Sequence, residues 1–157
     1  MYDQIFRERN SKWRKTNVRQ VWLEVDDYPK MVGSCDLGIC LHDSSSGFDL
    51  PMKVVDMFAA GLPCLAIGGY PSVTELVKDG SQEDAQKFGL IFLSSEELAE
   101  QIKTVLQGFD PANEAGATSL LREMRRDLAH FSRKENSWEA QWDRLLNEQV
   151  FATAKDR

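Results

Sequence analysis

The stretch DLGICLHDSSSGFDLPMKVVDMFAAGLPCLAI, residues 36–67, decides the fold of this 157-residue chain. It opens with one apolar run, residues 36–41, and closes with another, residues 63–67. Apolar runs without polar alternation are typical of parallel strands that are covered on both faces. Between them, residues 51–60 have a helical pattern with proline near the first turn and Gly61 after the end. The order strand, helix, strand predicts a βαβ unit.

The same alternation continues on both sides of this unit. Residues 94 and 95 are serines followed by two glutamates, so one of these serines is expected to cap a helix. Composition and spacing further predict strands over residues 19–25 and 90–93, a short helix near 26–29 with an aspartate cap and Pro29 in its first turn, and helices over 71–77, 95–107, 118–131 and 137–150. The predicted fold class is α/β, a doubly wound parallel sheet with C-terminal helices.

Charge and hydropathy restrict the kinds of partner. The net charge is -6 and the sequence pI is about 5.0, which argues against a protein that binds nucleic acid or an anionic membrane surface. The longest apolar stretch, residues 54–69, is interrupted by Asp56 and Pro63 and is shorter than the roughly 20 residues of a membrane span. No transmembrane segment is therefore expected, and the polar residues 1–20 do not resemble a secretory signal.

The cysteines indicate a reducing compartment. Cys35, Cys40 and Cys64 are odd in number and lie in or beside apolar runs, which favours reduced, buried thiols over disulfides. Together with His42 and His130 they show no metal-ligand spacing. Neither a metal site nor a cofactor is expected.

The C-terminal part carries apolar stripes at helical spacing. We expect these side chains to lie in the core or against another domain: Leu120, Leu121, Met124, Leu128, Phe131, Trp138, Trp142, Leu145 and Leu146. Three arginines lie close together on the first of the two helices, at positions 122, 125 and 126. They are interpreted as a solvated helix face rather than a phosphate site.

The segment between the first strand and its helix suits phosphate binding. Ligands of doubly wound sheets bind beyond the carboxyl ends of the strands, where residues 42–50 are expected to lie. Hydroxyl groups, a close backbone approach at Gly47 and the amide-rich start of a helix at Pro51 all favour an anion. The serines that supply the hydroxyls are Ser44, Ser45 and Ser46. The sequence predicts a diphosphate cradle that needs no metal.

Two charged residues follow on the same helix. Lys53 and Asp56 are three apart and share one helix face. The lysine suits a phosphate, and the carboxylate can accept hydrogen bonds from a ribose diol. An ordinary ion pair between the two side chains is an equal alternative at this point.

The quoted stretch, extended to residues 34–67, resembles the donor-binding part of the chitobiosyldiphosphodolichol beta-mannosyltransferases. Matching blocks are WLEVDDYPKMVGS at residues 22–34, TELVKDG at 74–80 and FGLIFLSSEELAEQI at 88–102. The resemblance is good over residues 18–107. It implies the Rossmann-like C-terminal half of a GT-B glycosyltransferase of family 33.

The resemblance also implies an activity. Enzymes of this family transfer mannose with inversion from GDP-mannose to dolichyl-diphosphate-chitobiose, forming a beta-1,4 linkage in N-glycan precursor synthesis at the cytosolic face of the endoplasmic reticulum. Lys53 and Asp56 then match the diphosphate and ribose contacts. The nucleotide-sugar-binding set comprises these two and His42, Ser44, Ser45, Ser46, Gly47, Phe48, Asp49, Leu50 and Pro51. His42 is either a sugar contact or a hydrogen-bonded structural residue.

The catalytic machinery is incomplete in this prediction. The general base is expected from the acceptor-binding half of the enzyme, and Asp49 is the nearby loop carboxylate that could serve or could orient the sugar loop. Guanine selectivity follows from the resemblance alone. The resemblance implies family members about three times as long, with an N-terminal membrane segment and an acceptor domain that are not expected within these 157 residues.

Three hypotheses about function follow. The first is the donor domain of a mannosyltransferase, inactive alone, which would meet the lipid acceptor through the N-terminal half and work beside other glycosyltransferases of the pathway. The second is a module that binds a nucleotide sugar or a partner protein without catalysis. The third is a nucleotide-binding α/β protein of other specificity. The expected division is a partial helix and linker over residues 1–17, a nucleotide-sugar-binding core over 18–108 and a helical segment over 109–157.

Overall fold

The computed structural model describes residues 16–80, 86–110, 112, 117–134 and 137–146. Within these ranges one parallel sheet forms, in the order β1 (Gly38–Cys40), β2 (Cys64–Ile67), β3 (Gly89–Phe92). Gly38 pairs with Cys64, and Cys64 pairs with Gly89. The predicted α/β class with a parallel sheet is confirmed.

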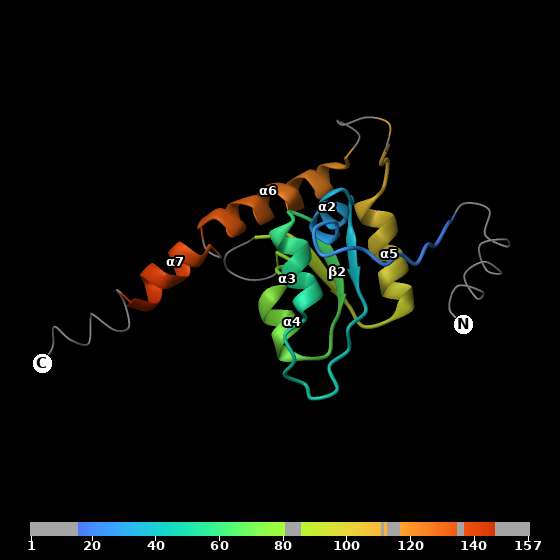
Figure 1. The fold of residues 1–157 in the computed structure, drawn as a ribbon. Coiled ribbons are helices and arrows are strands. Elements are labelled where there is room, and N and C mark those ends of the chain that lie inside the picture. The colour runs from blue at the N-terminus through green and yellow to red at the C-terminus, as the bar shows by residue number, and fades with distance from the viewer. Residues whose placement is uncertain (1–15, 81–85, 111, 113–116, 135–136, 147–157) are drawn as a thin grey trace, which may run out of the picture.

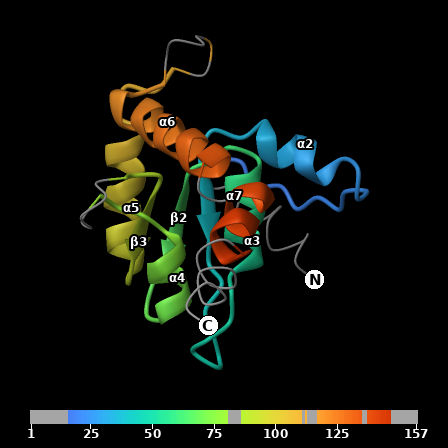
Figure 2. The same cartoon turned by 90° about the vertical axis from the view of Figure 1, so that its left-hand side faces the viewer.

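Helices connect and flank the strands. They are α2 (Tyr28–Gly33), α3 (Met52–Ala59), α4 (Pro71–Leu76), α5 (Ser95–Val105), α6 (Ser119–Lys134) and α7 (Trp138–Asp143). Helices α3 and α4 lie on one side of the sheet and α5 on the other (Figures 1 and 2). Helix α6 crosses one end of the sheet, and the loop after β1 projects from the opposite end (Figure 1).

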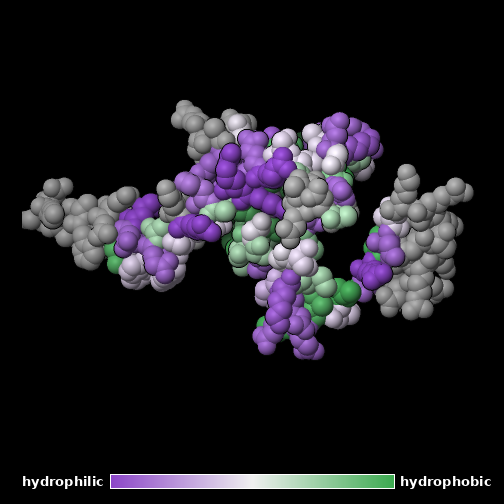
Figure 3. Space-filling view, turned by 90° about the horizontal axis from the view of Figure 1, so that it is seen from above, coloured by the Kyte–Doolittle hydropathy of each residue, from purple (hydrophilic) through white to green (hydrophobic). Residues whose placement is uncertain are grey.

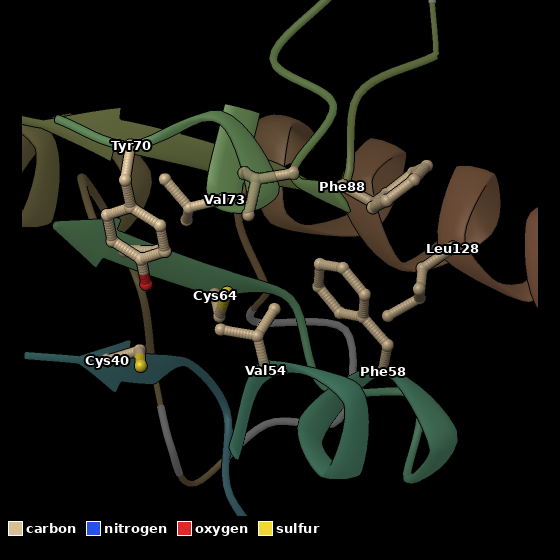
Figure 4. Packing of buried hydrophobic residues seen from close by; sticks show 10 residues of the cluster. Cys40, Val54, Phe58, Cys64, Tyr70, Val73, Phe88 and Leu128 are labelled. Carbon is tan, nitrogen blue, oxygen red and sulfur yellow. The ribbon is translucent and has the colours of Figure 1, made fainter. Parts of the chain in front are cut away.

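Apolar side chains fill the space on both faces of the sheet. On the α3 face, the Phe58 ring meets Phe88 edge-on with centroids 5.1 Å apart, and Leu128 of α6 packs beside them (Figure 4). On the other face, Leu65 of β2 packs with residues of α5 and α6. Because β2 is central, its Leu65 and Cys64 are fully buried. The sheet is therefore doubly covered along its middle strand.

Local capping follows the sequence closely. Ser94 is the N-cap of α5 and accepts a hydrogen bond from the Glu97 N–H at 3.1 Å, which identifies it as the predicted serine cap. Asp27 occupies the N-cap position of α2, and Pro29 lies in its first turn as expected. The Asp27 carboxylate, however, pairs with Lys30 at 3.0 Å and caps no amide.

The predicted strand over residues 19–25 is wrong. Residues 19–24 have no regular structure, and a turn begins at Val25. Trp22 is 92% exposed and Val25 is 86% exposed. A strand is stable only when a neighbour satisfies its backbone groups, so β-branched and aromatic composition alone does not form one.

The expectation that β1 is covered on both faces is also wrong in part. Ile39 is 42% exposed, whereas Gly38 and Cys40 are buried. Because β1 is the edge strand of the described sheet, helices cover it less than they cover β2. Cys40 and Cys64 are buried free thiols as predicted, but Cys35, in the turn after α2, is exposed.

The C-terminal stripes behave differently in the two helices. Leu121, Met124 and Leu128 of α6 are fully buried in the core. In α7 the rings of Trp138 and Trp142 stack on each other with centroids 5.4 Å apart, and they are 73% and 48% exposed. The predicted core role is thus confirmed for α6. The two tryptophans do not lie in the core of the described part of the chain, and their packing against another domain stays a prediction.

The outer face of α6 is polar, as Figure 3 shows from above. Arg125 pairs with Asp36 at 3.0 Å, and Arg126 pairs with the adjacent Asp127 at 3.0 Å. Arg122 donates to the backbone carbonyl of Ala117. The three arginines form a solvated helix face, as predicted.

Several predictions fall outside the described residues. The partial helix before residue 16 and the end of the last helix, from residue 147, cannot be compared with the structure. The division of the chain at residues 17 and 108 stays a prediction. None of the described helices combines the length and the apolar character that crossing a bilayer requires.

Candidate functional site

The loop at residues 42–50 lies beyond the carboxyl end of β1 and leads into α3. In Figure 1 it projects below the sheet, beside the start of α4. Within the loop, Ser44 is half-buried, whereas Phe48 is 80% exposed. The loop therefore occupies the predicted position at the ligand-binding edge of the sheet.

Asp49 organises the serine loop. Its Oδ2 accepts a hydrogen bond from Ser44 Oγ at 3.1 Å, and its Oδ1 accepts one from Ser46 Oγ at 3.0 Å. Ser44 Oγ in turn accepts from the N–H of Gly47 at 2.8 Å. Gly47 has a φ of 78°, which glycine adopts without strain. Both serine hydroxyls thus point toward a carboxylate, and a bound phosphate would have to compete with Asp49 for them.

The neighbouring β2–α4 junction holds this loop in place. The Tyr70 hydroxyl donates to the backbone carbonyl of His42 at 3.1 Å, and Ser72 Oγ donates to the carbonyl of Phe48 at 3.3 Å. The rings of Tyr70 and His42 meet edge-on with centroids 6.4 Å apart. The pattern of the serine loop did not reveal Tyr70 and Ser72. Their position directly after a second parallel strand is a signal that could have identified them, because the loops after parallel strands meet at one edge of a sheet.

His42 is half-buried at the end of β1, and its buried Nε2 atom has no hydrogen-bond partner in the described structure. Nε2 retains the capacity for one hydrogen bond, but its burial keeps it away from solvent. Tyr70, which meets the His42 ring, also lines a hollow of about 540 Å³ with Gly69, Pro71, Thr74 and Glu75. The two alternatives for His42, sugar contact and structural residue, therefore both stay open.

The start of α3 presents amides and a cation at the same edge. Pro51 is the N-cap residue and is buried, so its ring sets the start of the helix and does not face solvent. No side chain caps this end. The Val54 N–H bonds to the Pro51 carbonyl at 2.8 Å, which leaves the N–H groups of Met52 and Lys53 for an anion. Lys53 follows in the first turn and is exposed. This geometry is suited to an anionic group, and binding of a diphosphate here stays a prediction.

Lys53 and Asp56 do not pair with each other. Among the ion pairs of the described residues none joins them, and Asp56 Oδ2 instead accepts a hydrogen bond of 3.2 Å from the Tyr28 hydroxyl. Both charged side chains are exposed on α3. The ordinary ion-pair interpretation of their spacing is therefore not supported, and the two charges stay available to a ligand.

Two carboxylates belong to the same loop, those of Asp43 and Asp49. Burial, then Cys40, then the negative charges of Asp43 and Asp49 raise the pKa of Tyr70. These two aspartates oppose an incoming phosphate, so Lys53 and the amides at the start of α3 must offset their field. No group of three or more His, Cys, Asp or Glu side chains within the described ranges is arranged to hold a metal ion.

Comparison with curated proteins gives relatives over most of this chain. It is 43% identical over 122 residues, 77% of its length, to the human chitobiosyldiphosphodolichol beta-mannosyltransferase. It is 38% identical over 136 residues to the enzyme of that name from Dictyostelium discoideum. The chain is a relative of the chitobiosyldiphosphodolichol beta-mannosyltransferases. The resemblance seen in the sequence is confirmed.

One similar protein has a different name. Over 113 residues, 72% of this chain, the identity to the UDP-glycosyltransferase TURAN of Arabidopsis thaliana is 50%. The chain spans 22% of TURAN, 23% of the human beta-mannosyltransferase and 26% of the Dictyostelium one. No family model matches the chain, and no solved structure matches it. The likeness to beta-mannosyltransferases therefore concerns about a quarter of each relative.

Proposed function

We propose that this chain binds GDP-mannose as the donor part of a beta-mannosyltransferase. The observation that carries the proposal is the pair of exposed charges, Lys53 and Asp56, one turn apart on α3 and not paired with each other. Beside them are the uncapped start of α3 and the loop at the strand ends. A cation near open amides suits a diphosphate, and a carboxylate one turn further suits a ribose diol.

The proposed mechanism assigns charge stabilisation to this part of the enzyme. When the bond between mannose and the diphosphate breaks, negative charge develops on the departing GDP. The Lys53 ammonium and the first-turn amides of α3 stabilise that charge without requiring a metal ion. Each interaction strengthens as the charge grows, and so it lowers the barrier to transfer.

Asp49 has a positioning role in this proposal. Both of its oxygens are engaged by the hydroxyls of Ser44 and Ser46, so it holds the loop shape and is a poor candidate for the general base. Phe48 and Leu50, which are 80% and 53% exposed, then lie toward the transferred sugar, with Ser45 and Gly47 near the diphosphate. The base that deprotonates the acceptor comes from elsewhere in the longer protein.

The acceptor, partners and location are proposed for the longer protein. The names of the relatives specify a chitobiosyldiphosphodolichol substrate, so the acceptor would be the dolichol-linked chitobiose, held mainly outside these residues. The product would carry a beta-1,4 mannose, made at the cytosolic face of the endoplasmic reticulum beside other transferases of the same pathway. Transfer would then require more of the protein than this chain, which alone would bind the donor without turnover.

A second candidate function is binding of a nucleotide sugar or a partner protein without catalysis. A third is binding of a nucleotide other than GDP. The name of TURAN specifies a UDP-glycosyltransferase, which gives a particular reason to test uridine against guanosine. Purified full chain is titrated with GDP, UDP and ADP while its thermal unfolding is followed. A ligand at 100 times its Kd stabilises the fold by about 2.7 kcal/mol. Stabilisation by GDP supports the proposal, whereas a preference for UDP or ADP contradicts the GDP-mannose assignment.

Substitutions in α3 test the two charges. Lys53→Ala and Asp56→Ala should each weaken GDP binding about tenfold or more, because each removes a charged hydrogen-bonding partner of the nucleotide. Lys103→Ala and Glu100→Gln are matched controls, since these residues form an exposed i,i+3 pair on α5. Unchanged GDP affinity in both α3 variants would remove Lys53 and Asp56 from the site. Mannose transfer to a chitobiose lipid is assayed with and without a separately supplied N-terminal half. Transfer that depends on the added half supports a donor domain, and no transfer in either case supports a binding module.

A further inference from the structure

The Tyr28 hydroxyl and the Asp56 carboxylate connect two helices that are distant in sequence. The hydroxyl donates to Asp56 Oδ2 over 3.2 Å, across a separation of 28 residues. Tyr28 is the first residue of α2, which packs against α3. Nothing in the loop pattern or the charge spacing pointed to this tyrosine. It reaches the carboxylate that the proposed function assigns to the ribose.

The two side chains lie at a hollow between the helices. Its volume is about 340 Å³, within the roughly 300–1,000 Å³ of small-molecule pockets. Small side chains leave this space open on the α3 wall, where Asp56 is followed by Ala59 and Ala60, and on the α2 wall, where Gly33 lies opposite. The other lining residues are Tyr28, Pro29 and Val32. Tyr28 is 38% exposed and Asp56 is exposed, so a ligand can reach both.

The protonation state of Tyr28 suits a donor. Burial, then the negative charge of Asp56, then the hydrogen bond to Asp56 raise the pKa of Tyr28 above its ordinary value of 10.0. The phenol is therefore neutral near pH 7 and donates its proton to the carboxylate. Oδ2 is held by this hydrogen bond, while Oδ1 of Asp56 retains its capacity to accept from a ligand.

We propose that Tyr28 is a positioning residue which fixes the Asp56 carboxylate so that it receives the vicinal hydroxyls of a ribose. The inference rests on the proposed function, because it names how the same site recognises ribose. A free aspartate on a helix surface samples several rotamers, and a hydrogen bond to Oδ2 restricts them. A preorganised carboxylate loses less entropy when the diol binds. Tyr28 thus acts on the sugar of the nucleotide through Asp56.

The substitution Tyr28→Phe tests this role, because it retains the ring and removes the hydroxyl. The full chain and its variants are titrated calorimetrically with GDP and with 2′,3′-dideoxy-GDP, which lacks the diol. Tyr28→Phe should weaken GDP binding about three- to tenfold, the range of one hydrogen bond, and leave the affinity for the dideoxy analogue unchanged. In an Asp56→Asn background the same substitution should have no further effect on GDP binding. Lys30→Ala, which breaks only the Lys30–Asp27 pair on α2, is the control.

A second measurement needs no ligand. The phenol of Tyr28 is titrated by NMR in the wild-type chain and in Asp56→Asn. Removing the charge and the strong acceptor should lower the pKa of Tyr28 toward 10.0, while burial keeps it somewhat higher. An unchanged pKa would show that the two side chains do not interact in solution, and would overturn the inference whatever the nucleotide data show.

The outcomes separate this inference from the proposed function. If the wild-type chain binds neither GDP nor its dideoxy analogue, the proposed function fails and the role of Tyr28 fails with it. If the wild-type chain binds GDP but Tyr28→Phe weakens both ligands equally, Tyr28 only supports the fold and the inference alone is overturned. Tighter GDP binding by Tyr28→Phe would likewise overturn it, because the phenol would then compete with the ribose.

Discussion

The Tyr70 hydroxyl donates a hydrogen bond of 3.1 Å to the backbone carbonyl of His42. Tyr70 is the N-cap of α4, and His42 lies just after β1. The bond therefore joins two loops at the carboxyl edge of the sheet. Tyr70 also fills part of the core beside Cys40 (Figure 4). A single side chain therefore couples packing of the sheet to the position of the serine loop.

Replacing Tyr70 by phenylalanine should lower the free energy of unfolding by about 0.5–1.5 kcal/mol, because the part-buried His42 carbonyl loses its donor. Burial and the nearby negative charges raise the pKa of Tyr70, so the hydroxyl is present as a donor throughout the neutral range. Urea denaturation provides the measurement. Tyr28→Phe is the matched control, since its hydrogen bond is exposed and should contribute less to stability. Equal losses in the two variants would contradict this assignment.

Gly89 of β3 lies where the structure leaves no room for a larger side chain. A Cβ at this position would lie 2.6 Å from Cγ1 of Val77 and 2.9 Å from the backbone oxygen of Cys64. Gly89→Ala should therefore destabilise the fold by roughly 1–3 kcal/mol. At Gly33 a Cβ would find its nearest atom, the Ala60 carbonyl oxygen, at 4.0 Å, and Gly33→Ala should be neutral or slightly stabilising. Thermal unfolding midpoints of the two variants test the contrast, which a tolerated Gly89→Ala would refute.

Helix α6 should belong to the same cooperative unit as the sheet. Leu128 is fully buried in the cluster that contains Phe58 of α3 and Phe88. Leu128→Ala should therefore lower the free energy of unfolding by about 2–5 kcal/mol. Leu145, which is 46% exposed beyond α7, provides the control and should change stability by less than about 0.5 kcal/mol. Chemical denaturation followed by circular dichroism measures both. A separate, early transition of α6 in the wild-type chain would argue against a single unit.

The three thiols should react at different rates. Burial, and next the neighbouring Cys40, raise the pKa of Cys64 from 9.0 to about 12, so this thiol is protonated and unreactive at pH 8. Cys40 is buried as well, whereas Cys35 is exposed. A disulfide reagent at pH 8 should label one thiol rapidly in the native chain and all three after denaturation. The Cys35→Ser variant should lose the rapid phase, and labelling of two thiols in the native state would contradict the burial of this pair.

The raised pKa of Cys64 also has a consequence for stability. The unfolded chain releases this proton near pH 9, whereas the folded chain retains it until about pH 12. Its contribution to the free energy of unfolding is thus fully present below pH 9 and is lost as the pH rises toward 12. Comparing alkaline unfolding of the wild-type chain with Cys64→Ala measures this contribution. Equal pH dependence in the two proteins would count against it.

Elements with a strong local signal were predictable. The two apolar runs around α3, the glycine after its end and the serine cap of α5 each specify local structure, and the structure has them as expected. The strand expected over residues 19–25 had the right composition and failed. Strand formation depends on a hydrogen-bonding neighbour, and composition does not say whether one is present.

The location of the candidate site was predictable from the sequence, but the hydrogen bonds within it were not. Its position follows from a general rule about the carboxyl ends of parallel strands, and the types of residue in the serine loop follow from phosphate chemistry. The hydrogen bonds of Asp49 to both serines did not follow. Several conformations of a short polar loop satisfy the same pattern, and packing against Tyr70 and Ser72 selects one of them.

The sequence by itself determined the order of strands and helices from α2 onward, the parallel sheet and the resemblance to beta-mannosyltransferases. These depend on periodicity and on local motifs, which short segments carry independently of the rest of the chain. Only the tertiary structure decided that Asp56 bonds to Tyr28 rather than to Lys53. The choice of partner depends on which helices meet in space, and α2, which precedes β1, packs against α3, which follows it.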